Sequence, residues 1–129
     1  MDTNVMQRCD ARGLADRRTG RFSLAARPPL LRLRWGPRIA IDRDDVARVG
    51  SAIAASGSPA LPLLVEVTKL KEVTWEARTA ILAHDFPARV AVLGADPVDL
   101  VLTAFLVRTR TEVRFFTEPD HAEKWLLQG

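Results

Sequence analysis

The chain has 129 residues, of which 47% are hydrophobic and 27% charged, a size and composition that fit one folded domain and argue against a disordered chain. Its single cysteine, Cys9, excludes an internal disulfide and any zinc site built from several cysteines. No apolar run reaches the roughly 20 residues of a membrane helix, and no signal-peptide segment follows Met1, so we expect a cytoplasmic protein.

The charge is divided unevenly along the sequence. Residues 1–38 contain nine arginines and three aspartates, and residues 39–129 contain ten basic and thirteen acidic residues. The first region therefore carries +6 and the second −3, which together give the net charge of +3. The high pI, about 9.7, is a property of the amino-terminal region. Residues 1–20 show no sustained apolar periodicity, which predicts a flexible, arginine-rich tail before a domain that spans 21–129.

The domain is predicted to begin with a hairpin of two strands. The first strand covers 21–27, and Pro28-Pro29 turns the chain. In the stretch that follows, apolar and charged residues alternate with the period of a strand that has one buried and one exposed face: Leu31, Leu33 and Trp35 against Arg32 and Arg34. Prolines are tolerated at a sheet edge, which favours an antiparallel edge hairpin.

Helices and buried strands then alternate. After a short apolar stretch over 39–41, Asp42 is expected to cap a helix that ends before Gly57 and turns Val46, Val49 and Ile53 inward. Residues 61–67 and 89–93 are apolar enough for buried strands. Between them, Thr74 is expected to cap a helix that ends near His84, with Ala77, Ile81 and Leu82 inward.

The third helix is predicted to begin at Asp96-Pro97. Its apolar residues form one continuous stripe at helical spacing: Val98, Val101, Leu102, Phe105 and Leu106. A last strand over 113–116 precedes a last helix over 119–128 whose inward residues are Ala122, Trp125 and Leu126. The order β-β-α-β-α-β-α-β-α predicts an α/β domain. It consists of a mixed sheet with an N-terminal antiparallel hairpin followed by alternating βα units, with helices packed on the sheet.

Two stretches resemble a known family. VEVTKLKEVTWEARTAIL (65–82) is similar to the strand, loop and helix at the centre of STAS domains, the fold of SpoIIAA-type anti-anti-sigma factors. VAVLGADPVDLVLTAF with the later RFFTEPDHAEKWL resembles a bacterial subgroup of STAS/SpoIIAA-like proteins of unestablished role. The resemblance covers about 105 residues and implies a non-enzymatic regulatory or interaction module.

The resemblance also points to a candidate site at the start of the central helix. In the regulatory members of the family, a serine or threonine there accepts phosphate. The corresponding run here is Thr74, Trp75, Glu76 and Ala77, so the serine position carries Trp75 or Glu76. Thr74 is either a simple helix cap or a phosphate acceptor. Trp75 and Glu76 form either a contact surface or, for the tryptophan, a partly buried anchor. We take Thr74, Trp75 and Glu76 as the candidate binding residues.

Other polar residues have simpler interpretations. Gly94 to Pro97 lie where α/β folds bind anions, but Asp96 would repel a phosphate, so a capped turn is expected. His84 is expected to complement the negative helix end rather than to form an acid/base pair with Asp85. His121 and Glu123 are expected on a solvated face. No catalytic set, cofactor site or metal site is expected.

The sequence is compatible with three functions. The first is a non-enzymatic module that contacts itself, as a homodimer, or a regulatory protein, through the arginine-bearing edge hairpin or the helices carrying Trp75 and Trp125. The second is a small-molecule or lipid-binding domain with a pocket lined by Phe105, Phe115, Phe116 or Trp125. The third is nucleic-acid contact through arginines of the amino-terminal region: Arg17, Arg18, Arg21, Arg32, Arg34 and Arg38.

Overall fold

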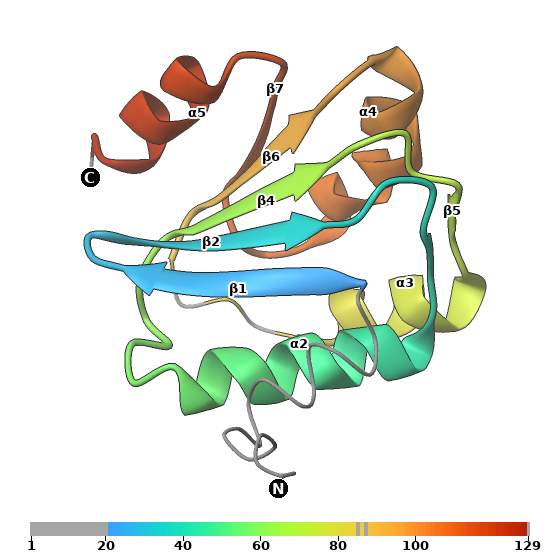
Figure 1. The fold of residues 1–129 in the computed structure, drawn as a ribbon, viewed down its shortest axis with the longest axis horizontal. Helices are drawn as coiled ribbons and strands as arrows, with labels where there is room; N and C mark the ends of the chain where they lie inside the picture. The colour runs from blue at the N-terminus through green and yellow to red at the C-terminus, as the bar shows by residue number, and fades with distance from the viewer. Residues whose placement is uncertain (1–20, 85, 87, 129) are drawn as a thin grey trace, which may run out of the picture.

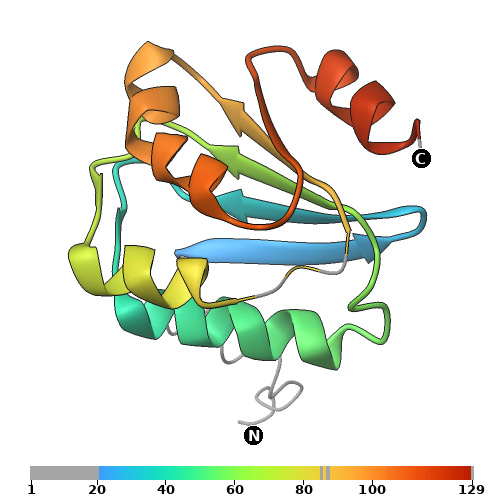
Figure 2. The same ribbon diagram turned by 180° about the vertical axis from the view of Figure 1, so that it is seen from behind.

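The structure is a computed structural model that describes residues 21–84, 86 and 88–128 (Figure 1). The predicted tail, residues 1–20, lies outside the described residues. The body is an α/β layered domain in which one sheet separates the C-terminal helix from the other helices, as the two opposite views show (Figures 1 and 2). None of the described helices is long and apolar enough to cross a membrane.

The main sheet has five strands in the order β1-β2-β4-β6-β7. Their bounds are Phe22–Arg27 for β1, Leu30–Trp35 for β2, Leu63–Val67 for β4, Val90–Gly94 for β6 and Val113–Phe116 for β7. The β1–β2 pair is antiparallel and every other pair is parallel. The predicted mixed sheet with an N-terminal hairpin at its edge is therefore confirmed.

Helices lie on both faces of this sheet. One face is covered by α2 (Arg43–Ala55), α3 (Trp75–Leu82), α4 (Pro97–Thr103) and the 3₁₀ helix η1 (Ala104–Arg108) (Figure 2). The opposite face carries α5 (Pro119–Leu126) over β4, β6 and β7 (Figure 1). Consecutive residues of a strand point to opposite faces, so the sheet supplies two cores. The first contains Leu33 and Trp35, and the second contains Leu64 and Trp125.

A second, two-stranded sheet joins the starts of two helices. Its strands are β3 (Ala40–Ile41) and β5 (Glu72–Val73), which pair in parallel. The sequence predicted the extended stretch over 39–41 but not β5, because two residues are too few to show a period. The Thr74 backbone N–H, directly after β5, donates to the carbonyl of Ile41 at 2.9 Å. Because β3 leads into α2 and β5 leads into α3, this pairing places the first turns of the two helices side by side.

The first turn of α2 is held by a reciprocal cap and an ion pair. Asp42 accepts the backbone N–H of Asp45 at 2.9 Å, and the Asp45 carboxylate accepts the N–H of Asp42 at the same distance. The bond from Asp45 is the main reason that the pKa of Asp42 is lowered. The buried Asp45 also accepts two hydrogen bonds from Arg21, at 2.8 and 2.9 Å, and these raise the pKa of Arg21. The start of β1 is thereby tied to α2.

The predicted apolar stripe on the third helix is wrong in part. Val98 and Val101 are 60% and 72% exposed, while Asp99 and Thr103 are buried on the opposite side of α4. Asp99 faces the fold because its carboxylate accepts three backbone N–H groups, the buried one of Leu70 and the partly buried ones of Lys69 and Ala95. The chain also tightens into η1 after Thr103, which shortens the period and leaves Leu106 as the buried residue of that segment.

Candidate functional site

The predicted cap at the start of α3 is present. The Thr74 hydroxyl oxygen accepts the backbone N–H of Ala77 at 3.1 Å. The Thr74 carbonyl accepts the N–H of Arg78 at 2.9 Å, and its own N–H is held by Ile41. Because these bonds fix the backbone on both sides of the first turn, the residues that follow are presented on a rigid element.

Trp75 projects from that turn into solvent. Its side chain is 75% exposed, the most exposed of the large hydrophobic residues in the described part of the chain. Glu76, beside it, is exposed as well. The interpretation of Trp75 as partly buried is therefore wrong, and the contact surface stays a prediction. Trp125, the other tryptophan proposed for a contact surface, is 6% exposed and packs on Phe116, so it does not offer such a surface.

The turn between β6 and α4 is filled by the chain's own carboxylates. Asp96 caps α4 by accepting the N–H of Asp99 at 3.1 Å, which confirms the predicted capped turn. Asp99 in turn accepts the N–H of Ala95 at 3.0 Å. A Cβ on Gly94 would lie only 2.9 Å from Leu100, so the backbone here approaches the helix closely. Two backbone donors that an anion would use here, those of Ala95 and Asp99, are therefore already bonded.

The arginines of β2 are paired with carboxylates. Arg32 donates to Glu66 at 2.6 Å and to Glu123 of α5 at 2.5 Å, and these contacts, led by Glu123, raise the pKa of Arg32. Arg34 lies 3.3 Å from Glu66. Glu123 thus belongs to an ion network rather than only to a solvated face. These pairs reduce the charge that the hairpin offers to a phosphate backbone. Arg17 and Arg18 lie outside the described residues.

The histidine next to the end of α3 packs against an aromatic ring. The rings of His84 and Phe86 meet edge to face with their centroids 4.8 Å apart. Asp85, its proposed partner in an acid/base pair, lies outside the described residues. Among the described residues, no group of three or more histidine, cysteine, aspartate or glutamate side chains is placed to hold a metal ion.

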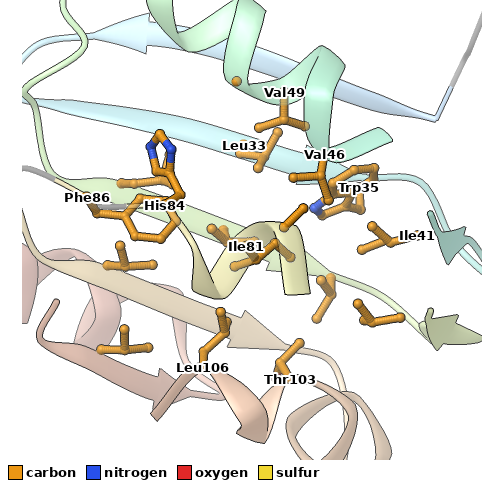
Figure 3. A pocket seen from close by; sticks show the side chains of 18 of the residues that line it. Leu33, Trp35, Ile41, Val46, Val49, Ile81, His84, Phe86, Thr103 and Leu106 are labelled. Atoms are coloured by element: carbon orange, nitrogen blue, oxygen red, sulfur yellow. The ribbon is translucent and has the colours of Figure 1, made fainter. Parts of the chain in front are cut away.

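An apolar cavity of about 150 Å³ lies between the sheet and the helices α2 and α3 (Figure 3). Strands β2, β4, β6 and β7 form its floor, and α2, α3, α4 and η1 form its walls. In a closed core, a void of this size costs on the order of 4 kcal/mol of stability. Val65, in the middle of the central strand, stays partly exposed on this side, whereas its neighbour Leu64 is fully buried on the other. The helix layer therefore does not close over the sheet.

Few polar groups border the cavity. The indole ring of Trp35 is 5% exposed, and in the described part of the chain no acceptor receives its N–H. Figure 3 shows the indole nitrogen on the side of the ring turned toward Val46 and Ile81, with His84 and Phe86 at the far end of the lining. The Thr103 hydroxyl, which also lines the space, already donates to the Asp99 carbonyl at 2.9 Å.

The position of this cavity differs from the pocket expected from the sequence. Phe105 lines it, as expected, but Phe115, Phe116 and Trp125 do not. Phe116 and Trp125 are packed together under α5, on the opposite face of the sheet. Sequence reasoning missed Trp35 and Gly50 as lining residues. The available signal was Gly50 itself, a glycine next to the inward stripe of a helix, where it weakens the helix without filling the core.

Comparisons with known proteins place the fold. No family model matches the chain, and no curated protein matches it. The structure is similar to the crystal structure of an uncharacterized protein of the DUF3478 family from Shewanella loihica PV-4, which has a SpoIIAA-like fold. The two chains share 18% sequence identity with a TM-score of 0.60, and the match covers 81% of this chain and 91% of the other. The chain therefore has the SpoIIAA-like α/β fold that its sequence resemblance predicted.

Proposed function

We propose that this chain is a cytoplasmic, non-enzymatic protein-interaction module whose contact surface is the first turn of α3. The observation that carries the proposal is the exposure of Trp75 on a backbone that is fixed by Thr74. Tryptophan is enriched among the residues that dominate binding energy at protein interfaces, and a large exposed aromatic side chain on a rigid element loses little freedom on binding. The single cysteine supports the location.

The use of the buried polar side chains supports a role other than catalysis. In the described residues these are Asp45, Asp99 and Thr103. Asp45 holds Arg21 and the cap of α2, and Asp99 holds backbone amides of two loops. Thr103 bonds to the carbonyl of Asp99 within its own helix. Each of them maintains the fold, so none is left for acid, base or nucleophilic chemistry.

The partner is either a regulatory protein or a second copy of the chain. A second copy is considered because β1 is an edge strand of the sheet, with backbone groups on its outer side that another strand can pair with. The Trp75 surface favours a partner with an apolar pocket beside a basic group, because Glu76 adds a negative charge next to the indole ring. Phosphorylation of Thr74 is a separate hypothesis, and the proposed contact surface does not depend on it.

The experiment compares the proteins retained from the source organism by the wild-type chain, Trp75→Ala and Val101→Ala. Val101 is the matched control, because it is similarly exposed but lies on α4. We expect a partner that is retained by the wild type and Val101→Ala and lost with Trp75→Ala. Light scattering on the purified chains shows whether that partner is a second copy. If every retained protein, or self-association, survives Trp75→Ala, the proposed surface is wrong.

A further inference from the structure

The apolar cavity lies apart from the Trp75 surface and suggests a second activity. We propose that it binds a small, uncharged aromatic molecule carrying one hydrogen-bond acceptor, which receives the indole N–H of Trp35. The proposal does not depend on the protein-interaction function, because Trp75 does not line the cavity. It rests on the volume of the space, an unsatisfied donor, and an exposed glycine at the border of the space.

The volume fits a molecule with a single ring. At about 150 Å³, the cavity is of the size at which an apolar void in a protein core takes up benzene rather than water. Three aromatic side chains contribute to the lining, Trp35, Phe86 and Phe105. Aromatic pairs gain stabilisation from ring geometry in addition to apolar burial, which favours an aromatic ligand over an aliphatic one.

The Trp35 N–H supplies the polar recognition. A buried donor without an acceptor is unfavourable, and tryptophan N–H groups in protein interiors usually have a partner. Here the donor is on the cavity side of the ring, and no described residue accepts from it (Figure 3). A carbonyl or ether oxygen on the ligand would satisfy it. Two other polar side chains line the cavity, His84 at the far end from Trp35 and Thr103, whose hydroxyl is already bonded. The rest of the lining is apolar, which disfavours a charged ligand.

Gly50 keeps the space open from the α2 side. It lies between Val49 and Ile53 in the sequence and borders the cavity, but it is itself exposed, and a Cβ built on it meets no atom within 4 Å. Glycine in a helix interior is less stable than alanine by roughly 1 kcal/mol. A larger side chain at this position would strengthen the helix, and one as long as leucine is expected to cover the open side of the cavity. The sequence instead has the residue that leaves the volume free.

The first test is an NMR titration of the full chain with acetophenone. The chain has three tryptophans, so the indole N–H signals are few, and Trp35→Phe assigns the one that belongs to Trp35. We expect acetophenone to move the Trp35 signal downfield as the N–H gains an acceptor. The control ligand, α-methylstyrene, has the same shape with a CH₂ group in place of the carbonyl oxygen, and we expect it to bind without that downfield movement.

The same pair of ligands measures the hydrogen bond. In Trp35→Phe, the affinity for acetophenone relative to α-methylstyrene should fall roughly fivefold, the effect of one net hydrogen bond. Comparing the two ligands in the same variant removes any effect of the substitution on the fold. An unchanged ratio would show that Trp35 does not donate to the ligand and would overturn the assignment.

The second test closes the cavity without touching Trp35. Gly50→Leu is expected to raise the melting temperature and to abolish binding of both probes, whereas Gly50→Ala should also be stabilised and still bind. The titration of the wild-type chain stands on its own if Gly50→Leu fails to fold. The proposal is overturned if the Trp35 signal stays unmoved at the solubility limit of acetophenone, if the only moving indole signals are those of Trp75 or Trp125, or if folded Gly50→Leu binds as the wild type does.

Discussion

The buried carboxylate of Asp99 accepts the backbone N–H of Leu70 at 2.6 Å, which joins the start of α4 to the loop between β4 and β5. The same carboxylate accepts the N–H of Lys69 at 3.0 Å, where the backbone has a positive φ of 50°. With Ala95 as its third donor, Asp99 takes the place that a bound anion has in other α/β loops. Two loops at the carboxyl edge of the sheet are thereby held by one side chain.

Removal of this carboxylate should be strongly destabilising. Asp99→Ala leaves the buried N–H of Leu70 and the partly buried N–H groups of Lys69 and Ala95 without their acceptor. A buried donor without an acceptor costs about 1–3 kcal/mol, and the other two cost less. We expect a total loss of about 3 kcal/mol or more in the free energy of unfolding, measured by urea denaturation. Asp96→Ala is the matched control on the same helix, since it removes only an N-cap and should cost about 1 kcal/mol. Equal losses in the two variants would contradict the role given to Asp99.

Because α4 turns its valines to solvent, we expect substitution of a valine to have little effect on stability, in contrast to Asp99→Ala. Because Val101 faces solvent, Val101→Lys should change the free energy of unfolding by no more than about 0.5 kcal/mol. Leu106→Ala, at the buried position of η1, should cost about 2–5 kcal/mol. Thermal denaturation of the two variants distinguishes this arrangement from a helix whose valines are buried, in which Val101→Lys would also unfold the domain.

The cap of α2 should make the free energy of unfolding depend on pH at the acid end. The pKa of Asp42 in the folded chain lies below its ordinary value of 3.8, chiefly because the Asp45 N–H bonds to its charged form. Its contribution to stability is therefore complete above the unfolded pKa and is lost as the pH falls through the lowered folded value. In Asp42→Asn the amide oxygen still caps the helix but no longer titrates.

The measurement is the free energy of unfolding as a function of pH for the wild type, Asp42→Asn and Asp44→Asn. Asp44 is the control, because it lies in the same turn and is exposed. We expect the acid-side fall in stability to be shallower in Asp42→Asn than in Asp44→Asn. Identical slopes in the three chains would show that the cap does not respond to protonation.

Much of the fold could be predicted because periodicity reports burial directly. Leu31, Leu33 and Trp35 alternate with arginines, so both the strand and its buried face were evident, and all three are buried as expected. The caps at Asp42, Thr74 and Asp96 were predictable from residue type, since each is a short polar side chain immediately before a helix. Local chemistry decides these features, and local chemistry is visible in sequence.

Features that depend on distant residues were not predictable. Asp99 reads as a surface residue of an amphipathic helix, and only the loop of Lys69 and Leu70 explains why it is inside. The cavity depends on the spacing of two helices over the sheet, which no single segment encodes. Thr74 and Trp75 were identified from the resemblance, but the exposure of Trp75 depends on what packs beside α3. Such properties belong to the assembled fold.

The most direct measurement of the open cavity is a crystal structure determined under xenon pressure. Xenon enters apolar cavities that water leaves empty, and its density is easily recognised. We predict a xenon atom between the sheet and α2, in the space bordered by Trp35, Val65 and Gly50. Absence of xenon there, with the side chains of α2 and α3 packed directly onto β4, would contradict the cavity and with it the proposed ligand site.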